Sequence, residues 1–204
     1  SALECLSRFR ADIEHASHVR KLSMLLFDAL QRQHELGIDA REVLRFAALL
    51  HDVGAAIGYD GHAEHSYYII KNAKLRGFTG DELGLIANVA RYHGKAKPRR
   101  RDGSFDTLRK AERRMVRWLS ALLRIAEGFD RSHYQLVSDI RVRGGRTGLV
   151  IQVDARPEAQ LEGSRHPGFF AARALRAQEA HQVFAQAVGA DAPQERRAGL
   201  AAGL

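Results

Sequence analysis

A histidine and an aspartate stand side by side at the end of an apolar segment, in a position where both could bind one metal ion. They are His51 and Asp52, within the run Leu-Leu-His-Asp-Val-Gly at 49–54. Burying an imidazole and a carboxylate there is costly unless each is paired or binds a metal. Neighbouring residues of a helix point about 100° apart, but near a helix end both can reach one ion. Nitrogen and oxygen donors together suit Mn, Fe, Zn, Ni or Co.

Two further polar residues lie among apolar ones and could complete such a site. His18 precedes Val19 on the apolar side of the first predicted helix, and Asp130 lies near the end of a later helix. Four donors from three helices could converge on one ion and leave coordination positions open for water or phosphate. Each feature also has an ordinary explanation, since His-Asp pairs are common by chance, His18 could be a core histidine, and Asp130 could simply end a helix.

The elements that must position these residues are mainly helical. Apolar residues recur at three- and four-residue steps, and Thr79 with Glu82 forms the sequence pattern of a capping box. Asp39 is the expected N-cap of the second helix, which is apolar on nearly all sides and is therefore expected to be the central core helix. The predicted helices are 13–34, 39–53, 62–74, 80–93 and 108–131.

Later in the chain the pattern changes from helical to strand-like. Runs at 138–143 and 149–154, which alternate or are rich in β-branched residues, flank the glycine-rich segment 144–148 and predict a β-hairpin. Helical character returns over about 168–188. These elements predict a small α+β unit after the helical part.

The expected fold class is mostly α, with three regions along the chain of 204 residues. Residues 1–135 are expected to form a metal-binding bundle of five or six helices. Residues 136–190 are expected to form the hairpin-plus-helix appendage packed on it, and residues 191–204 a disordered tail.

The composition indicates a basic protein outside the membrane. The formal net charge is +8, so the chain should attract anions such as polyphosphate or nucleotides, with nucleic acid a less favoured partner. No run of about 18 apolar residues and no signal-peptide core are present, so we expect a cytoplasmic protein. The single cysteine excludes an internal disulfide framework and a cysteine zinc cluster. A homodimer is compatible with the sequence but is not indicated by it.

The order of the candidate ligands resembles the HD superfamily of metal-dependent phosphohydrolases, in which a histidine, a His-Asp pair and an aspartate on successive helices bind metal. In detail the chain looks like the C-terminal HD-type domain of the exopolyphosphatase / guanosine pentaphosphate phosphohydrolase (Ppx/GppA) proteins. The resemblance covers nearly the whole chain, including the hairpin. The segments that carry it are His15–Arg20, Leu26–Asp28, Ala47–Gly54, His65–Ile70, Ala90–Lys95 and Ala126–His133.

The resemblance implies a helical HD-type fold and a metal site at His18, His51, Asp52 and Asp130. Some members of the family lack the full ligand set in this domain, whereas this chain has all four residues, which favours a metal site. The family places its polyphosphate-cleaving site in an N-terminal actin-like domain, and this chain contains none of the glycine-rich phosphate-binding loops of that domain. The chain is therefore interpreted as a free-standing relative or as an excised C-terminal part, and exopolyphosphatase chemistry does not carry over to it.

Three more histidines stand where dinuclear members of the HD superfamily place extra ligands. His62 and His65 are three residues apart, so one helical face could hold both, and His93 follows a later helix. They could bind a second metal ion, or one of them could act as a general acid on a leaving oxygen. The ordinary alternative is a set of loop histidines near a helix start.

Basic residues that could contact phosphate follow His93 and flank Asp130. Arginine and lysine beside the site would neutralise phosphate charge and steer anionic substrates, although a run of charges is often only a solvated loop. The candidate phosphate-binding residues are Lys95, Lys97, Arg99, Arg100, Arg101, Arg124 and Arg131.

The function expected from these residues is that of a hydrolase, a metal-dependent phosphohydrolase acting on a phosphate ester or anhydride of a nucleotide or polyphosphate-like anion. The cofactor would be one or two divalent ions, of Mn, Mg, Ni, Co, Fe or Zn, and Asp52 could orient the attacking water or accept its proton. Two alternatives stay open. The domain could bind or sense a polyanion without catalysis, or the metal could only pin helices together.

Overall fold

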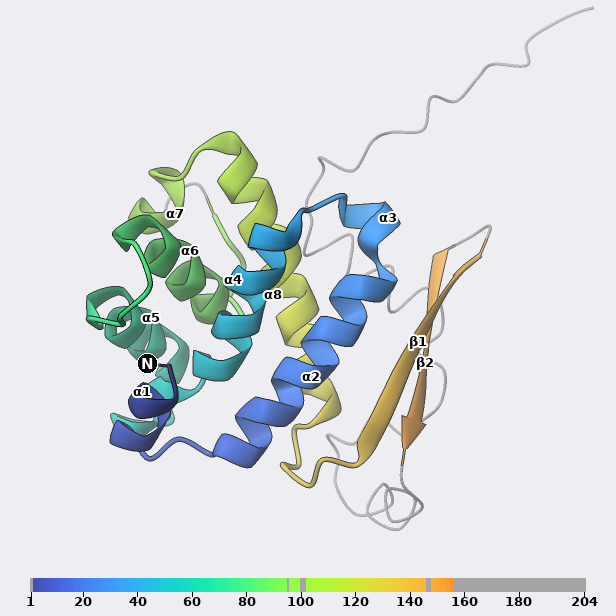
Figure 1. The fold of residues 1–204 in the computed structure, drawn as a ribbon, viewed down its shortest axis with the longest axis horizontal. Coiled ribbons are helices and arrows are strands. Elements are labelled where there is room, and N and C mark those ends of the chain that lie inside the picture. The colour runs from blue at the N-terminus through green and yellow to red at the C-terminus, as the bar shows by residue number, and fades with distance from the viewer. Residues whose placement is uncertain (1, 95, 100–101, 146–147, 156–204) are drawn as a thin grey trace, which may run out of the picture.

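The computed structural model describes residues 2–94, 96–99, 102–145 and 148–155, and its helices pack around a central one (Figure 1). That central helix is α4 (Ile38–Leu50), which contacts α1 (Ala2–Arg8), α2 (Ile13–Ala29), α6 (Gly80–Arg91) and α8 (Lys110–Phe129). The expectation that the helix apolar on nearly all sides lies in the core is therefore confirmed. The mostly α fold class predicted from the sequence is confirmed as well.

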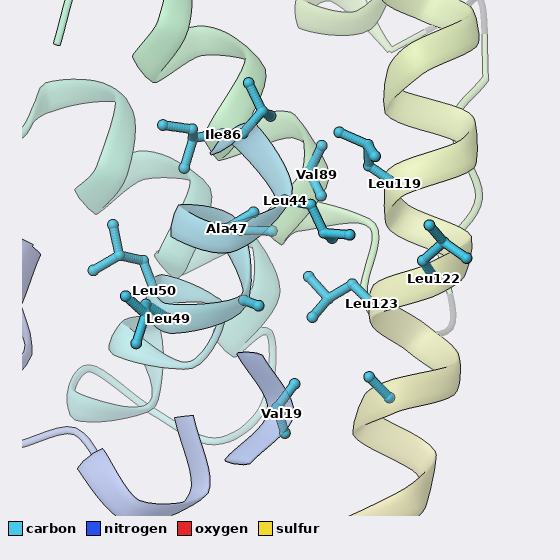
Figure 2. Close-up of a cluster of buried hydrophobic side chains, with 14 of the residues drawn as sticks. Val19, Leu44, Ala47, Leu49, Leu50, Ile86, Val89, Leu119, Leu122 and Leu123 are labelled. Carbon is cyan, nitrogen blue, oxygen red and sulfur yellow. The ribbon is translucent and has the colours of Figure 1, made fainter. Parts of the chain in front are cut away.

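Small and branched aliphatic side chains of α4 form the middle of the core. Leu44, Ala47 and Leu50 are each 0% exposed. Figure 2 shows Leu44 together with Val89 of α6 and Leu123 of α8. Because helices on several sides pack against α4, the residues that follow its last turn are held firmly in place.

The structure divides the first predicted helix in two and moves the start of the second. Helix α2 ends at Ala29, and Leu30, with φ −105° and ψ 16°, separates it from the short α3 (Gln31–His34). Helix α4 begins at Ile38 with Gly37 as its N-cap, so the prediction that Asp39 caps it is wrong. Asp39 lies instead in the first turn, where its negative charge interacts favourably with the helix dipole.

The remaining predicted helices are confirmed, with ends shifted by a few residues. They are α5 (His62–Asn72), α6 and α8, and a short α7 (Gly103–Asp106), which was not predicted, lies between the predicted helices 80–93 and 108–131. The capping box of α6 is formed as predicted, since Glu82 N donates to Thr79 Oγ1 and Thr79 N donates to Glu82 Oε2 at 2.7 Å. None of the described helices has both the length and the apolar character needed to cross a membrane.

Directly after α4 the chain turns through a 3-10 helix, η1 (Val53–Ala56), that packs against α5. Gly54 N donates a hydrogen bond of 2.9 Å to Ser66 Oγ. A Cβ atom on Gly54 would collide with the backbone at His62 and Ser66, so this close approach needs a glycine. The contact places the start of α5 beside the end of α4.

The predicted hairpin is confirmed and shares the core of the helical body. Strands β1 (Val137–Gly145) and β2 (Gly148–Ala155) pair antiparallel, with Ile140 opposite Val153, and β1 packs against α2 (Figure 1). Val137, Ile140 and Ile151 are buried in the same hydrophobic cluster as the helices. The helix predicted over 168–188 and the tail predicted over 191–204 lie outside the described residues, so the proposed three-region division of the chain stays a prediction.

Replacing Gly54 with alanine should destabilise the protein. We expect Gly54→Ala to lower the free energy of unfolding by at least about 2 kcal/mol, because the added carbon meets backbone atoms that cannot move aside independently. Urea denaturation followed by circular dichroism measures the change.

The matched control is Gly84→Ala, since a Cβ on Gly84 inside α6 meets no atom within 4 Å. This substitution should raise the free energy of unfolding by about 0.5–1 kcal/mol through helix propensity. Equal effects of the two substitutions would show that the approach of η1 to α5 is looser than described.

Candidate metal centre

Two groups of metal-ligating side chains meet at Asp52. One group is His15, His51 and Asp52, the other is Asp52, His62 and His93, and the donor atoms within each group lie within 4.8 Å of one another. Asp52 Oδ2 is 3.5 Å from His51 Nε2 and 3.8 Å from His15 Nε2. Asp52 Oδ1 is 3.5 Å from both His62 Nε2 and His93 Nε2. One carboxylate therefore faces two pairs of imidazoles, one with each oxygen.

The ends of four α-helices and of one 3-10 helix bring these side chains together. His15 lies in the first turn of α2, and His51 is the C-cap of α4. Asp52 is the N-cap of η1, and His62 is the first residue of α5. His93 comes just after α6. The packing of α2 and α6 on α4, and of α5 on η1 and α6, therefore sets the geometry of the cluster.

Three of the histidines are oriented by backbone carbonyls. The Nδ1 atoms of His51, His62 and His93 lie 2.9 Å from Ala48 O, 2.7 Å from Tyr59 O and 2.6 Å from Ala90 O, respectively. A carbonyl oxygen can only accept a hydrogen bond, so each Nδ1 must carry a proton and donate it. Nε2, the usual ligating atom in this tautomer, is left to face Asp52 in all three rings.

His15 is oriented by a buried carboxylate. Its Nδ1 donates to Asp130 Oδ2 at 2.9 Å, and Asp130 is 0% exposed. Asp130 Oδ1 accepts a hydrogen bond of 2.8 Å from Gln135 N. A carboxylate that holds the second nitrogen of a ligating histidine is a common support of metal sites, where it fixes the ring and raises its basicity.

Glu127 supplies a second carboxylate to the first group. Its Oε2 lies 3.1 Å from both His15 Nε2 and His51 Nε2. Glu127 was not among the ligands predicted from the sequence. The signal was present, because Glu127 is a charged residue in the apolar run Ile125-Ala126-Glu127 of α8.

The charges of the first group depend on one another. Burial lowers the pKa of His15, but its hydrogen bonds to Asp130 and Glu127 outweigh burial and raise the pKa to about 10. Burial also lowers the pKa of His51, yet the charges of Asp52 and Glu127 raise it overall. Burial raises the pKa of Glu127, and the hydrogen bonds from His15 and His51 bring it far below its usual range. The buried carboxylates thus require positive charge beside them, from protons or from a cation.

The second group contains a neutral histidine beside another imidazole. Burial and the charge of His51 lower the pKa of His93 to about 4, so its ring is neutral. His93 Nε2 lies 3.1 Å from His62 Nε2, and two lone pairs at this distance repel unless a proton or a metal ion lies between them. Asp52 Oδ1 is buried and accepts no hydrogen bond. Nitrogen and carboxylate donors in this arrangement fit a divalent ion.

Two of the predicted ligands lie outside the two donor groups. His18 belongs to neither group, and His15, one turn earlier on the same helix, lies in the first. Asp130 lies behind His15, and Glu127 faces the cluster. Each difference is a shift of three residues, slightly less than one helical turn, which the apolar pattern alone cannot resolve.

Of the other predicted site residues, some lie at the cluster and others lie away from it. His62 and His93 join Asp52 as predicted, whereas His65 belongs to neither donor group and packs against the glycine-containing loop before α5. Lys97, Arg99 and Arg131 are exposed. Lys95, Arg100 and Arg101 lie outside the described residues.

Arg124 is the basic residue most closely tied to the site. Its Nη2 donates to Tyr92 O and Ala96 O, both at 2.8 Å, on either side of His93 along the chain. Burial lowers the pKa of Arg124, and its Nε has no hydrogen-bond partner. Among the described residues no carboxylate forms an ion pair with it, so its charge is left uncompensated.

Comparisons with known proteins agree with the resemblance to Ppx/GppA proteins. A family model described as Ppx/GppA phosphatase, domain III, matches residues 1–153. Guanosine-5'-triphosphate,3'-diphosphate pyrophosphatase of Aeromonas hydrophila subsp. hydrophila is 35% identical over 125 residues, which are 59% of this chain and 24% of that protein. The Aeromonas salmonicida protein of the same name is 37% identical over 83 residues, 40% of this chain and 17% of that protein. The chain thus spans at most about a quarter of the length of these relatives.

The raised pKa of His15 gives the chelator-treated protein a characteristic pH dependence. His15 keeps its proton in the folded state up to about pH 10, whereas it loses that proton near pH 6.5 when unfolded. Its contribution to stability is therefore complete below about pH 6.5 and is lost as the pH rises towards 10. We expect the free energy of unfolding in EDTA to fall by about 1.4 kcal/mol per pH unit between about pH 7 and 9.5 for this one proton.

Chemical denaturation at a series of pH values measures this slope. In Glu127→Gln the slope should be shallower, because the substitution removes one of the two carboxylates that hold the proton. A wild-type stability that stays constant over this range would contradict the described charge coupling.

Proposed function

This chain belongs to the Ppx/GppA phosphatase family, whose domain III it matches, and we propose that it binds divalent metal ions around Asp52 and hydrolyses a phosphate ester or anhydride. The observation that carries the proposal is the position of Asp52 between two pairs of histidine Nε2 atoms. A carboxylate in that position can bridge two ions. The order of the ligands along the chain, a histidine, a His-Asp pair and a later carboxylate, supports assignment to the HD type, with Glu127 as the last carboxylate.

The first ion would be held by His15, His51, Asp52 and Glu127, and the second by Asp52, His62 and His93. A pair of divalent ions would lower the pKa of a bound water and neutralise charge on a phosphate. Asp52 Oδ1, to which no described residue donates a hydrogen bond, would bind the second ion, and the carboxylate would orient that water. Asp130 and the three backbone carbonyls would keep the imidazoles in the ligating orientation.

Arg124 would contact the phosphate of the substrate. A half-buried guanidinium with only carbonyl partners among the described residues favours an anion nearby, because an anion compensates its charge. Its bonds on both sides of His93 place that charge next to the second donor group. The net charge of +8 would assist the approach of an anionic substrate. We infer a nucleotide or polyphosphate-like anion as the substrate class, in keeping with the guanosine phosphate in the names of the relatives.

A second candidate function is binding or sensing of a polyanion without catalysis. It is favoured by the net charge of +8 and by exposed basic side chains, which could hold a polyanion without bound ions. The two functions differ in one respect. Turnover requires the bound ions, whereas binding to exposed Lys97, Arg99 and Arg131 would depend mainly on salt concentration.

Asp52→Asn should abolish binding at both ion positions, because both groups use this carboxylate. Isothermal titration with Mn, Mg, Ni and Co measures binding, and a screen of phosphate esters and anhydrides with each ion measures turnover. We expect wild-type protein to bind two ions and to hydrolyse at least one compound class, and Asp52→Asn to lose both properties while its melting curve stays cooperative.

The control is Asp28→Asn, the same chemical change at a surface aspartate whose partner is Arg41. It should keep wild-type metal binding and turnover. Metal binding without turnover of any compound would favour the binding function. Wild-type protein that binds no ion would reject the proposed function.

A further inference from the structure

An exposed histidine is stacked on the buried ligand candidate His15. The rings of His133 and His15 are nearly parallel, with an interplanar angle of 8° and centroids 3.7 Å apart. His133 lies in the turn between α8 and β1, and its side chain is 44% exposed. His133 belongs to a segment that carries the family resemblance, and no role was predicted for it from the sequence.

The backbone of this turn is shaped to bring His133 over His15. His133 has φ 61° and Gln135 has φ 50°, a left-handed conformation that non-glycine residues adopt rarely. Both residues are tied to Asp130, since His133 N donates to Asp130 O at 2.9 Å and Gln135 N donates to Asp130 Oδ1 at 2.8 Å. The residue that orients the edge of His15 therefore also organises the turn that covers its face.

Asp12 accepts hydrogen bonds from both histidines. Its Oδ1 accepts a hydrogen bond of 3.0 Å from His15 N and so caps α2. Its Oδ2 accepts a hydrogen bond of 3.0 Å from His133 Nδ1. One carboxylate thus fixes the backbone of His15 and the ring stacked upon it.

We propose that Asp12 and His133 are positioning residues that set the ring plane of His15 for metal binding. The inference rests on the proposed function, because it assumes that His15 Nε2 binds an ion. In the metal-free protein hydrogen bonds hold both nitrogens of His15, Nδ1 to Asp130 and Nε2 to Glu127. An ion bound at Nε2 would replace the second hydrogen bond, and the stacked ring of His133 would then keep the ring plane in position.

The decisive variant is His133→Gly. Glycine adopts the left-handed conformation without strain, so the melting temperature should stay equal or rise while the stacked ring is lost. We expect the dissociation constant for Mn²⁺ at the tighter position to increase about 10-fold to 100-fold, the usual effect of removing a residue that supports a metal ligand. If the turn had only a structural role, the affinity for Mn²⁺ would not change.

The variant Asp12→Ser separates the N-capping role of Asp12 from its hydrogen bond to His133, whose ring stacks on His15. Serine can still accept the hydrogen bond from His15 N, so α2 keeps its cap, but the contact with His133 Nδ1 is lost. We expect a melting temperature close to wild type and an increase of about 10-fold in the dissociation constant.

The control is Glu35→Gly, which relieves a left-handed residue of φ 55° at the end of α3, far along α2 from His15 (Figure 1). It should leave metal affinity unchanged. Nitrogen NMR of the metal-free protein gives a second readout, in which the ring resonances of His15 should shift and broaden in His133→Gly and not in Glu35→Gly.

Wild-type affinity and unchanged His15 resonances in His133→Gly would overturn the inference and leave the proposed function standing. Failure of the wild-type protein to bind Mn²⁺ would overturn both. Loss of affinity in His133→Gly without a loss of melting temperature is the result that we expect.

Discussion

The need of buried carboxylates for positive charge is the constraint on which the site depends. Asp130 is fully buried, and Asp52 and Glu127 are only partly exposed. Around them the histidines of the first group hold protons more tightly than free imidazole, while His93 holds its proton less tightly. Protons can satisfy the first group, and the second needs a proton or a metal ion between the facing Nε2 atoms of His62 and His93. A pair of divalent ions would satisfy both groups at once, which is why we favour metal binding over a purely structural cluster.

The packing of the helical bundle holds the residues of this cluster in place. Helix α4 is surrounded by other helices, so its C-terminal end, where His51 and Asp52 lie, cannot shift without disturbing the core. Gly54 then lets η1 approach α5 closely enough to bring His62 to Asp52. Asp130 links the end of α8 to His15 on α2. Packing of apolar residues and orientation of polar ones are therefore parts of the same arrangement.

The sequence predicted the helices and the hairpin well because their apolar periodicity is regular. It pointed to His51 and Asp52 because they are polar residues at the end of an apolar run, and to His62 and His93 through the family resemblance; the structure brings the four side chains close to one another. It gave His18 rather than His15, and Asp130 rather than Glu127, as ligands. Apolar periodicity indicates which helices could contribute to the site but not which helical turn reaches it. The roles of Asp12 and His133 depend on a left-handed turn and a stacking contact, and neither leaves a pattern in the sequence.

The most direct test of the central claim is a crystal structure of the full chain grown with Mn²⁺, with anomalous diffraction measured to locate the ions. We expect two anomalous peaks flanking Asp52, one bounded by His15, His51 and Glu127 and the other by His62 and His93. A single peak at the first group would retain the metal site but reject the bridging role of Asp52. No peak beside Asp52 at millimolar Mn²⁺ would contradict the assignment of this cluster as a metal centre.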